Sequence, residues 1–209
     1  MEFFDFHHHQ AGRTAGIYNL NFKGNPPEHF FSAGIHPDAV TVDFGEQVDW
    51  LRKISTAVNC VAIGECGLDG LIDVDEELQK KAFLAQIALA NSVQKPLIIH
   101  CVKRFSQLLQ FRTLSKVPMI IHGFNKRETV GEFLLENDFC LSFGKSVLYN
   151  VNLQAFVKQV PTEKLFLETD SADFEIKQLY QKVADLKNIS LQTLTDKIKE
   201  NLKKIQIPI

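Results

Sequence analysis

The chain has 209 residues, of which 45% are hydrophobic and 23% are charged, so one soluble domain spanning 1–209 has enough material to bury a core. Its formal net charge of −2 excludes a global basic field, and a nucleic-acid partner would have to be held locally. No apolar run approaches the roughly 18 residues of a membrane span, and residues 1–30 lack the apolar core of a signal peptide. The four cysteines form no CxxC pair, so we expect reduced thiols in a cytoplasmic protein without a membrane partner.

Short apolar runs alternate with amphipathic segments along the chain. Unbroken apolar runs of this length suit strands that are buried on both faces of a parallel sheet. We predict strands over 2–6, 17–22, 30–35, 60–63, 97–99, 119–121, 139–143 and 165–167. Helical patterns lie between the later runs, over 46–58, 75–94, 104–116, 126–137, 152–159, 174–187 and 191–205.

Eight strands followed mostly by helices predict an α/β protein with a (β/α)8 TIM barrel. The chain is short for this fold, which typically needs about 250 residues. The barrel would be shortened in its first βα units, because residues 1–36 have room for three strands and no full helix between them. An open doubly wound sheet is the alternative. Asp73 and Glu76 have the spacing of a capping box for the second helix, and Ser190 is a candidate N-cap for the last.

Ionisable side chains follow the apolar runs where the predicted strands end. His7 and His9 close the first run, and residues two apart on a strand share a face. Other runs are followed by His36, Glu65, His100, His122 and Asp170. Because the carboxyl ends of barrel strands meet on one face, we expect these side chains to gather there.

Six of these residues are candidate metal ligands: His7, His9, Glu65, His100, His122 and Asp170. Any one of them alone is more often a structural hydrogen-bonding residue or a helix cap. Together they are too many for one tetrahedral ion and suit two divalent ions that activate water. Four imidazoles with two carboxylates favour zinc, manganese, iron or nickel over calcium, and magnesium is a further candidate in an assay.

The ordered motifs resemble the TatD family of metal-dependent deoxyribonucleases, which are amidohydrolase-like barrel enzymes. The matching pieces are Asp5-Phe-His7-His-His9, Gly34-Ile-His36-Pro37, Ile63-Gly-Glu65-Cys-Gly-Leu-Asp69, Pro96-Leu-Ile-Ile-His100, Ile120-Ile-His122-Gly-Phe124 and Leu167-Glu-Thr-Asp170-Ser171. Each motif is weak alone, but the ordered set covers nearly the whole chain.

The resemblance implies a ligand set: the first metal is held by His7, His9 and Asp170, the second by His100 and His122, and Glu65 bridges both. It also implies that His36 faces the substrate phosphate. Asp170 and Glu65 would be the catalytic residues, with Asp170 orienting the metal-bridged hydroxide or taking its proton. The implied reaction is phosphodiester hydrolysis of DNA or short nucleotides, of the 3′-5′ exonuclease type in several members, with no obligate protein partner.

Two positions depart from the family pattern. Many members carry an arginine where this chain has Val102, and Ala172 replaces a common proline. We therefore expect an intact metal centre, with substrate binding that is reduced or made by other residues.

Five basic residues lie just beyond predicted strand ends: Lys103, Arg104, Lys126, Arg127 and Lys145. Their positions suit phosphate contacts and equally suit ordinary exposed helix starts. Lys103, Arg104 and Arg127 join His36 as the candidate substrate-binding residues.

Two alternative functions remain beside the phosphodiesterase. One is an amidohydrolase-type enzyme that cleaves a small amide or ester; relatives of that kind often bridge their metals with a carboxylated lysine, whereas Glu65 is already a carboxylate. The other is a non-catalytic metal-binding interaction protein, which the trimmed early loops suggest.

Overall fold

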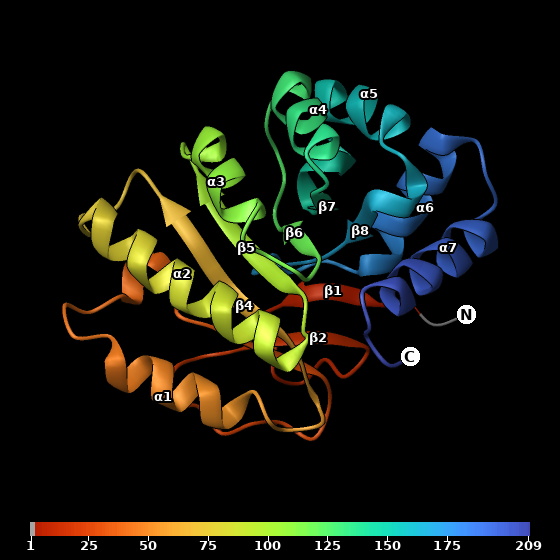
Figure 1. Cartoon of the computed structure of the whole chain (residues 1–209). Coiled ribbons are helices and arrows are strands. Elements are labelled where there is room, and N and C mark those ends of the chain that lie inside the picture. Colours follow the sequence, from red (N-terminus) through yellow and green to blue (C-terminus); the bar gives the residue numbers. More distant parts are fainter. Residues whose placement is uncertain (1–2) are drawn as a thin grey trace.

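The computed structural model describes residues 3–209, and within this range eight parallel strands form one sheet in sequence order (Figure 1). The strands are β1 (Asp5–His8), β2 (Gly16–Leu20), β3 (Phe31–Ala33), β4 (Cys60–Asp69), β5 (Leu97–Val102), β6 (Met119–Ile121), β7 (Cys140–Phe143) and β8 (Leu165–Leu167). Glu2, which we predicted to be part of the first strand, lies outside the described residues.

The sheet closes on itself through the residues that follow its first and last strands. The backbone N–H of Asp170 donates to the carbonyl of His7 at 2.9 Å, and the N–H of His9 donates to the carbonyl of Asp170 at 3.2 Å. These bonds join β1 to the chain after β8. The fold is therefore the predicted (β/α)8 barrel and not the open doubly wound sheet.

Helices surround the strands on the outside of the barrel (Figure 1). In the described part of the chain they are α1 (Gly45–Ile54), α2 (Glu76–Val93), α3 (Leu108–Arg112), α4 (Glu128–Glu136), α5 (Val151–Gln159), α6 (Ile176–Lys187) and α7 (Leu191–Lys204). Segments 9–15 and 21–30, which connect the first three strands, contain no helix. This confirms that the early βα units are the shortened ones.

Three helices differ from the predictions at their ends. Helix α1 ends at Ile54 and not at residue 58, because the hydroxyls of Ser55 and Thr56 donate to the last carbonyls of the helix. Asp75, not Asp73, caps α2, because its carboxylate accepts the backbone N–H of Leu78 at 2.9 Å. Helix α3 is much shorter than the predicted 104–116: the hydroxyl of Ser115 donates to the carbonyl of Val117 and accepts its N–H, and this local turn competes with further helix. Ser190 caps α7 as predicted.

Strand β4 runs to Asp69, well beyond the predicted end at residue 63. It continues to pair with β5, placing Gly67 opposite His100. Gly67 has φ +141°, and a Cβ atom there would lie 2.1 Å from the carbonyl oxygen of His100, so the close approach requires glycine. The long pairing brings the side chains at the end of β4 beside those of β5.

Across residues 3–209, no helix combines the length and apolar character needed to cross a bilayer.

Candidate metal centre

The first cluster of possible ligands lies where β1 meets the chain after β8. His7, His9, Glu65 and Asp170 each offer one ligand atom, and these atoms all lie within 4.8 Å of one another. Glu65 Oε1 is 2.5 Å from His7 Nε2 and 3.3 Å from His9 Nε2. Asp170 Oδ1 is also 3.3 Å from His9 Nε2. Such a set of imidazole and carboxylate groups fits a divalent transition metal.

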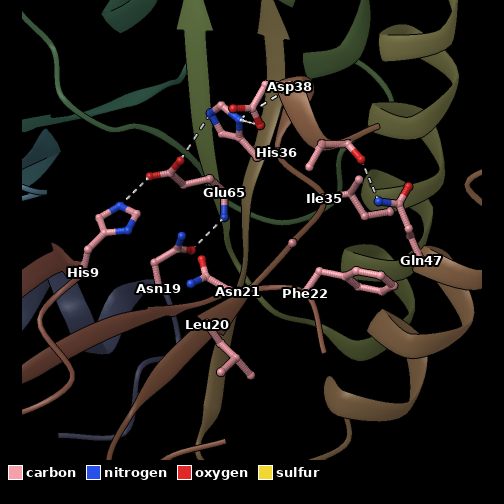
Figure 2. A pocket seen from close by; sticks show the side chains of 12 residues that line it. His9, Asn19, Leu20, Asn21, Phe22, Ile35, His36, Asp38, Gln47 and Glu65 are labelled. Carbon is pink, nitrogen blue, oxygen red and sulfur yellow. Dashed lines mark hydrogen bonds and ion pairs between the residues drawn. The ribbon is translucent and has the colours of Figure 1, made fainter. Parts of the chain in front are cut away.

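A second cluster shares the Glu65 carboxylate. His36, Glu65 and His100 also offer ligand atoms within 4.8 Å of one another. His36 Nε2 lies 3.5 Å from Glu65 Oε2, the oxygen that does not contact His7 or His9. Figure 2 shows Glu65 between His9 and His36, with dashed lines to both. The two oxygens of one buried carboxylate thus face two groups of imidazoles.

His122 lies between the two clusters. Its Nε2 is 3.6 Å from Glu65 Oε1. The centroid of its ring is 4.7 Å from that of His7 and 5.7 Å from that of His100. The other five side chains predicted as ligands therefore gather around Glu65. The structure adds His36, which we expected to face substrate only, to the possible ligand groups.

The charges of the centre are strongly coupled. Burial would raise the pKa of Glu65, but His122 and His7 outweigh it and hold that pKa below its usual range. The pKa of His9 is raised to about 10 by hydrogen bonds to Asp170 and Glu65. Burial opposes protonation of His122, but Glu65 and Glu168 raise its pKa to about 9. Without metal, protons on these imidazoles balance the buried carboxylates, so the donor set suits divalent cations, which can replace them.

Acidic and amide side chains hold the candidate ligands in place. His100 Nε2 lies 2.9 Å from Asp69 Oδ2, at the end of β4. Asn19 Oδ1 accepts the backbone N–H of Glu65 at 3.1 Å. The Glu168 carboxylate accepts the N–H of Gly123 at 2.5 Å and lies 3.5 Å from His122 Nδ1. Asp69 and Glu168 stand in the matched motifs, but their residue pattern predicts no separate role for them, and no pattern points to Asn19.

The basic residues predicted to bind substrate lie outside the clusters. Lys103 is exposed, and Arg104 pairs with Glu76 at 2.8 Å. Arg127 is exposed and precedes α4. Their roles as phosphate contacts stay predictions.

Three neighbours of the candidate ligands, His8, Cys66 and Cys101, pack away from the centre. His8 is buried beside Tyr18, with 6.0 Å between the ring centroids. Cys66 and Cys101 are buried, and burial raises the pKa of the Cys101 thiol to about 12. Both cysteines therefore act as packing residues.

The family assignment follows from comparison of the sequence with known families. A sequence model of the TatD-related DNase family matches residues 13–206. The chain belongs to this family. It is therefore a metal-dependent hydrolase, and the resemblance in the motifs is confirmed.

Curated relatives agree with this assignment. The chain is 29% identical over 196 residues to the uncharacterised metal-dependent hydrolase YabD of Bacillus subtilis, covering 84% of this chain and 76% of YabD. It is 28% identical over 194 residues to the 3′-5′ ssDNA/RNA exonuclease TatD of Pectobacterium parmentieri, covering 86% of this chain and 69% of that protein. The exonuclease of the same name from Pantoea ananatis is 32% identical over 154 residues, covering 67% of this chain and 56% of its own length.

Solved structures of this TatD-family fold superpose over almost the whole chain. The TatD homologue YJJV from Escherichia coli has a TM-score of 0.83 at 18% identity, covering 98% of this chain and 97% of that one. A TatD-family hydrolase from Entamoeba histolytica has a TM-score of 0.80 at 19% identity, covering 100% and 99%. At these identities the likeness concerns the barrel fold alone.

Proposed function

We propose that this chain is a phosphodiesterase that shortens single-stranded nucleic acid from its 3′ end and uses two divalent metal ions. The observation that carries the proposal is the position of Glu65, whose two carboxylate oxygens face different groups of histidines. A shared carboxylate of this kind suits a pair of ions. The names of the Pectobacterium and Pantoea relatives support the substrate class and the direction.

The proposed ligands follow from the clusters: His7, His9 and Asp170 hold one ion, His100 and His122 hold the other, and Glu65 contacts both. When bound, such ions lower the pKa of water and offset the charge that develops on phosphoryl oxygens. The Asp38 carboxylate lies 2.5 Å from His36 Nδ1 and orients the ring, so that Nε2 faces the centre, where it would contact the scissile phosphate.

Asp170 is the proposed proton acceptor. Burial would raise its pKa, but hydrogen bonding to His9 and the charge of His122 hold it below the usual range. The carboxylate is therefore ionised at neutral pH and able to take a proton from attacking water. Its side chain is 40% exposed, so substrate and water reach it.

The proposal is tested with a 5′-labelled single-stranded oligonucleotide in the presence of manganese. Nucleotide release is followed as shortening of the labelled strand. EDTA should abolish release, and Asp170→Asn and Glu65→Gln should each lower kcat/KM by at least about a hundredfold. Asp173→Asn, an exposed aspartate three residues from Asp170, is the matched control and should retain wild-type activity. Full activity of both site variants would refute the proposal. Turnover of amides alone would favour the amidohydrolase, and metal binding without any hydrolysis would favour the interaction protein.

A further inference from the structure

Two clefts flank the candidate metal centre on opposite sides of the barrel mouth. The first, of about 330 Å³, begins at His9 and Glu65 and extends past Asn21 and Phe22 (Figure 2). The second, of about 260 Å³, begins at Asp170 and extends past Lys145 and Tyr149. The first lies at the ends of β2 and β3 and the second at the ends of β6 and β7, which stand across the barrel from each other.

The first cleft has no lysine or arginine in its lining. His9 and Glu65 belong to the centre, and the other ionisable side chains of the cleft are His36 and the Asp38 carboxylate beside it. Lys23 stands next to Phe22 in the chain, but its charge is paired with Glu46 at 2.7 Å. Apart from His36, which we assign to the scissile phosphate, a further phosphate group would find no lysine or arginine partner in this cleft.

The second cleft is basic beyond the metal centre. Its carboxylates, Glu168 and Asp170, belong to the centre, whereas Lys145 lines the cleft farther out. Asn125 lines both this cleft and a neighbouring hollow that contains Lys126, Arg127 and one carboxylate, Glu128. Within residues 3–209, Lys145, Lys126 and Arg127 make no ion pair. Two adjoining hollows with an excess of cationic side chains therefore lie on the Asp170 side of the centre.

Tyr149 adds an aromatic surface to the second cleft. Its side chain is 69% exposed, so the ring is accessible from the cleft. Proteins that bind single strands without sequence preference combine a basic groove with aromatic rings on which bases stack. Lys145 and Tyr149 supply both parts of that combination within one cleft.

The two sides of the scissile bond at a 3′ end also differ in charge, as the two clefts do. The terminal nucleoside carries no phosphate beyond the scissile one, whereas each nucleotide on the 5′ side brings a further negative charge. The Asn21 side chain and Asn19 Nδ2 make no hydrogen bond with any residue in 3–209, so these amides have donors and acceptors free for a base edge. The cleft without lysine or arginine suits the terminal nucleoside, and the basic cleft suits the rest of the nucleotide chain.

We propose that Lys145 and Tyr149 bind the nucleotides on the 5′ side of the scissile bond, and that the cleft beside Asn21 and Phe22 receives the 3′-terminal nucleoside. This assignment rests on the proposed function and adds the path of the substrate to it.

The first test compares an oligonucleotide with a dinucleotide as substrates of the metal-loaded enzyme. In Tyr149→Ala the ratio of kcat/KM for the long substrate to that for the short one should fall about tenfold, because a stacked base is lost. Tyr149→Phe keeps the ring and should keep the ratio. Val151→Ala, an exposed residue outside both clefts, is the control. An unchanged ratio in Tyr149→Ala would overturn the role of this residue.

The second test measures how charge contributes to substrate binding in each cleft. Lys145→Ala should reduce the slope of log affinity against log salt by about 0.7, because one phosphate contact is lost, whereas the exposed Lys158→Ala should leave the slope unchanged. A 3′-phosphorylated oligonucleotide should be cleaved at least about tenfold more slowly than its 3′-hydroxyl form, because its extra charge enters a cleft that has no lysine or arginine and contains the Asp38 carboxylate. An unchanged salt slope in Lys145→Ala, or equal cleavage of the two 3′ ends, would overturn the assignment of the corresponding cleft.

These outcomes separate the two proposals. Failure of the wild-type enzyme to cleave any phosphodiester, or cleavage from the 5′ end, refutes the proposed function itself. Normal 3′-end cleavage that is indifferent to Tyr149, Lys145 and the 3′-phosphate refutes only the path of the substrate.

Discussion

The carboxylate of Asp5 accepts two hydrogen bonds from Thr169, one from its backbone N–H at 2.8 Å and one from its hydroxyl at 2.6 Å. Arg13 donates to the same carboxylate at 2.8 Å. Asp5 is fully buried inside β1, and Thr169 directly precedes Asp170. One carboxylate therefore fixes the segment that both closes the barrel and presents a candidate ligand.

Replacing Asp5 with asparagine should destabilise the protein by about 2–4 kcal/mol. The amide cannot accept from both donors of Thr169 and from Arg13, because its NH2 group would face one of them. Urea unfolding measures the loss. Asp49→Asn removes a carboxylate that pairs with Arg52 at the same distance of 2.8 Å on an exposed helix face, and should leave stability essentially unchanged. Equal effects of the two substitutions would show that Asp5 does not hold the closure.

Metal loading should release protons. The pKa of His9 is raised to about 10 and that of His122 to about 9, so both are protonated at pH 7–8 in the metal-free protein. A ligand imidazole must be neutral, so binding expels about two protons and the apparent affinity falls as the pH is lowered. Calorimetry in two buffers with different ionisation enthalpies measures the number released, and His9→Asn should lower it by about one. Heats that do not depend on the buffer would contradict this expectation.

Metal content distinguishes ligands from substrate contacts. Glu65 belongs to both clusters, so Glu65→Gln should weaken the binding of both ions, whereas His7→Asn should weaken the binding of one. His36→Asn should retain the full metal content and raise KM, because we assign its Nε2 to the phosphate. Elemental analysis after gel filtration gives the stoichiometry of each variant. Loss of one equivalent in His36→Asn would instead make this residue a ligand.

Much of the centre was predictable because each candidate ligand follows an apolar run. Strands buried on both faces leave a continuous hydrophobic signal, and the barrel then brings their ends together. The ends of these strands therefore predict, from the sequence alone, that His7, His100 and Asp170 lie on one face. The shortened first units were also predictable, since 1–36 is too short for helices between its strands.

Other features depend on contacts that the local sequence does not carry. Gly64 and Gly67 suggest a turn after residue 63, yet in the fold they let β4 continue against β5. The pairing of Arg104 with Glu76 links residues far apart in the chain. The local sequence therefore suits a phosphate contact of Arg104 as well as an ordinary exposed position. Only packing shows that Glu168 faces the Nδ1 side of the His122 ring.

Glu168 should position His122 for metal binding. Its carboxylate is fully buried, one oxygen lies 3.5 Å from His122 Nδ1, and the other has no hydrogen-bond partner among residues 3–209. Glu168→Gln keeps the size of the side chain but removes the charge, and should lower metal affinity about tenfold to a hundredfold, as loss of such supporting groups does. The metal concentration for half-maximal activity should rise, and activity should recover at saturating metal. Glu163→Gln, on an exposed turn before β8, is the control. An unchanged metal requirement in Glu168→Gln would mean that this acid serves the barrel structure and not the metal centre.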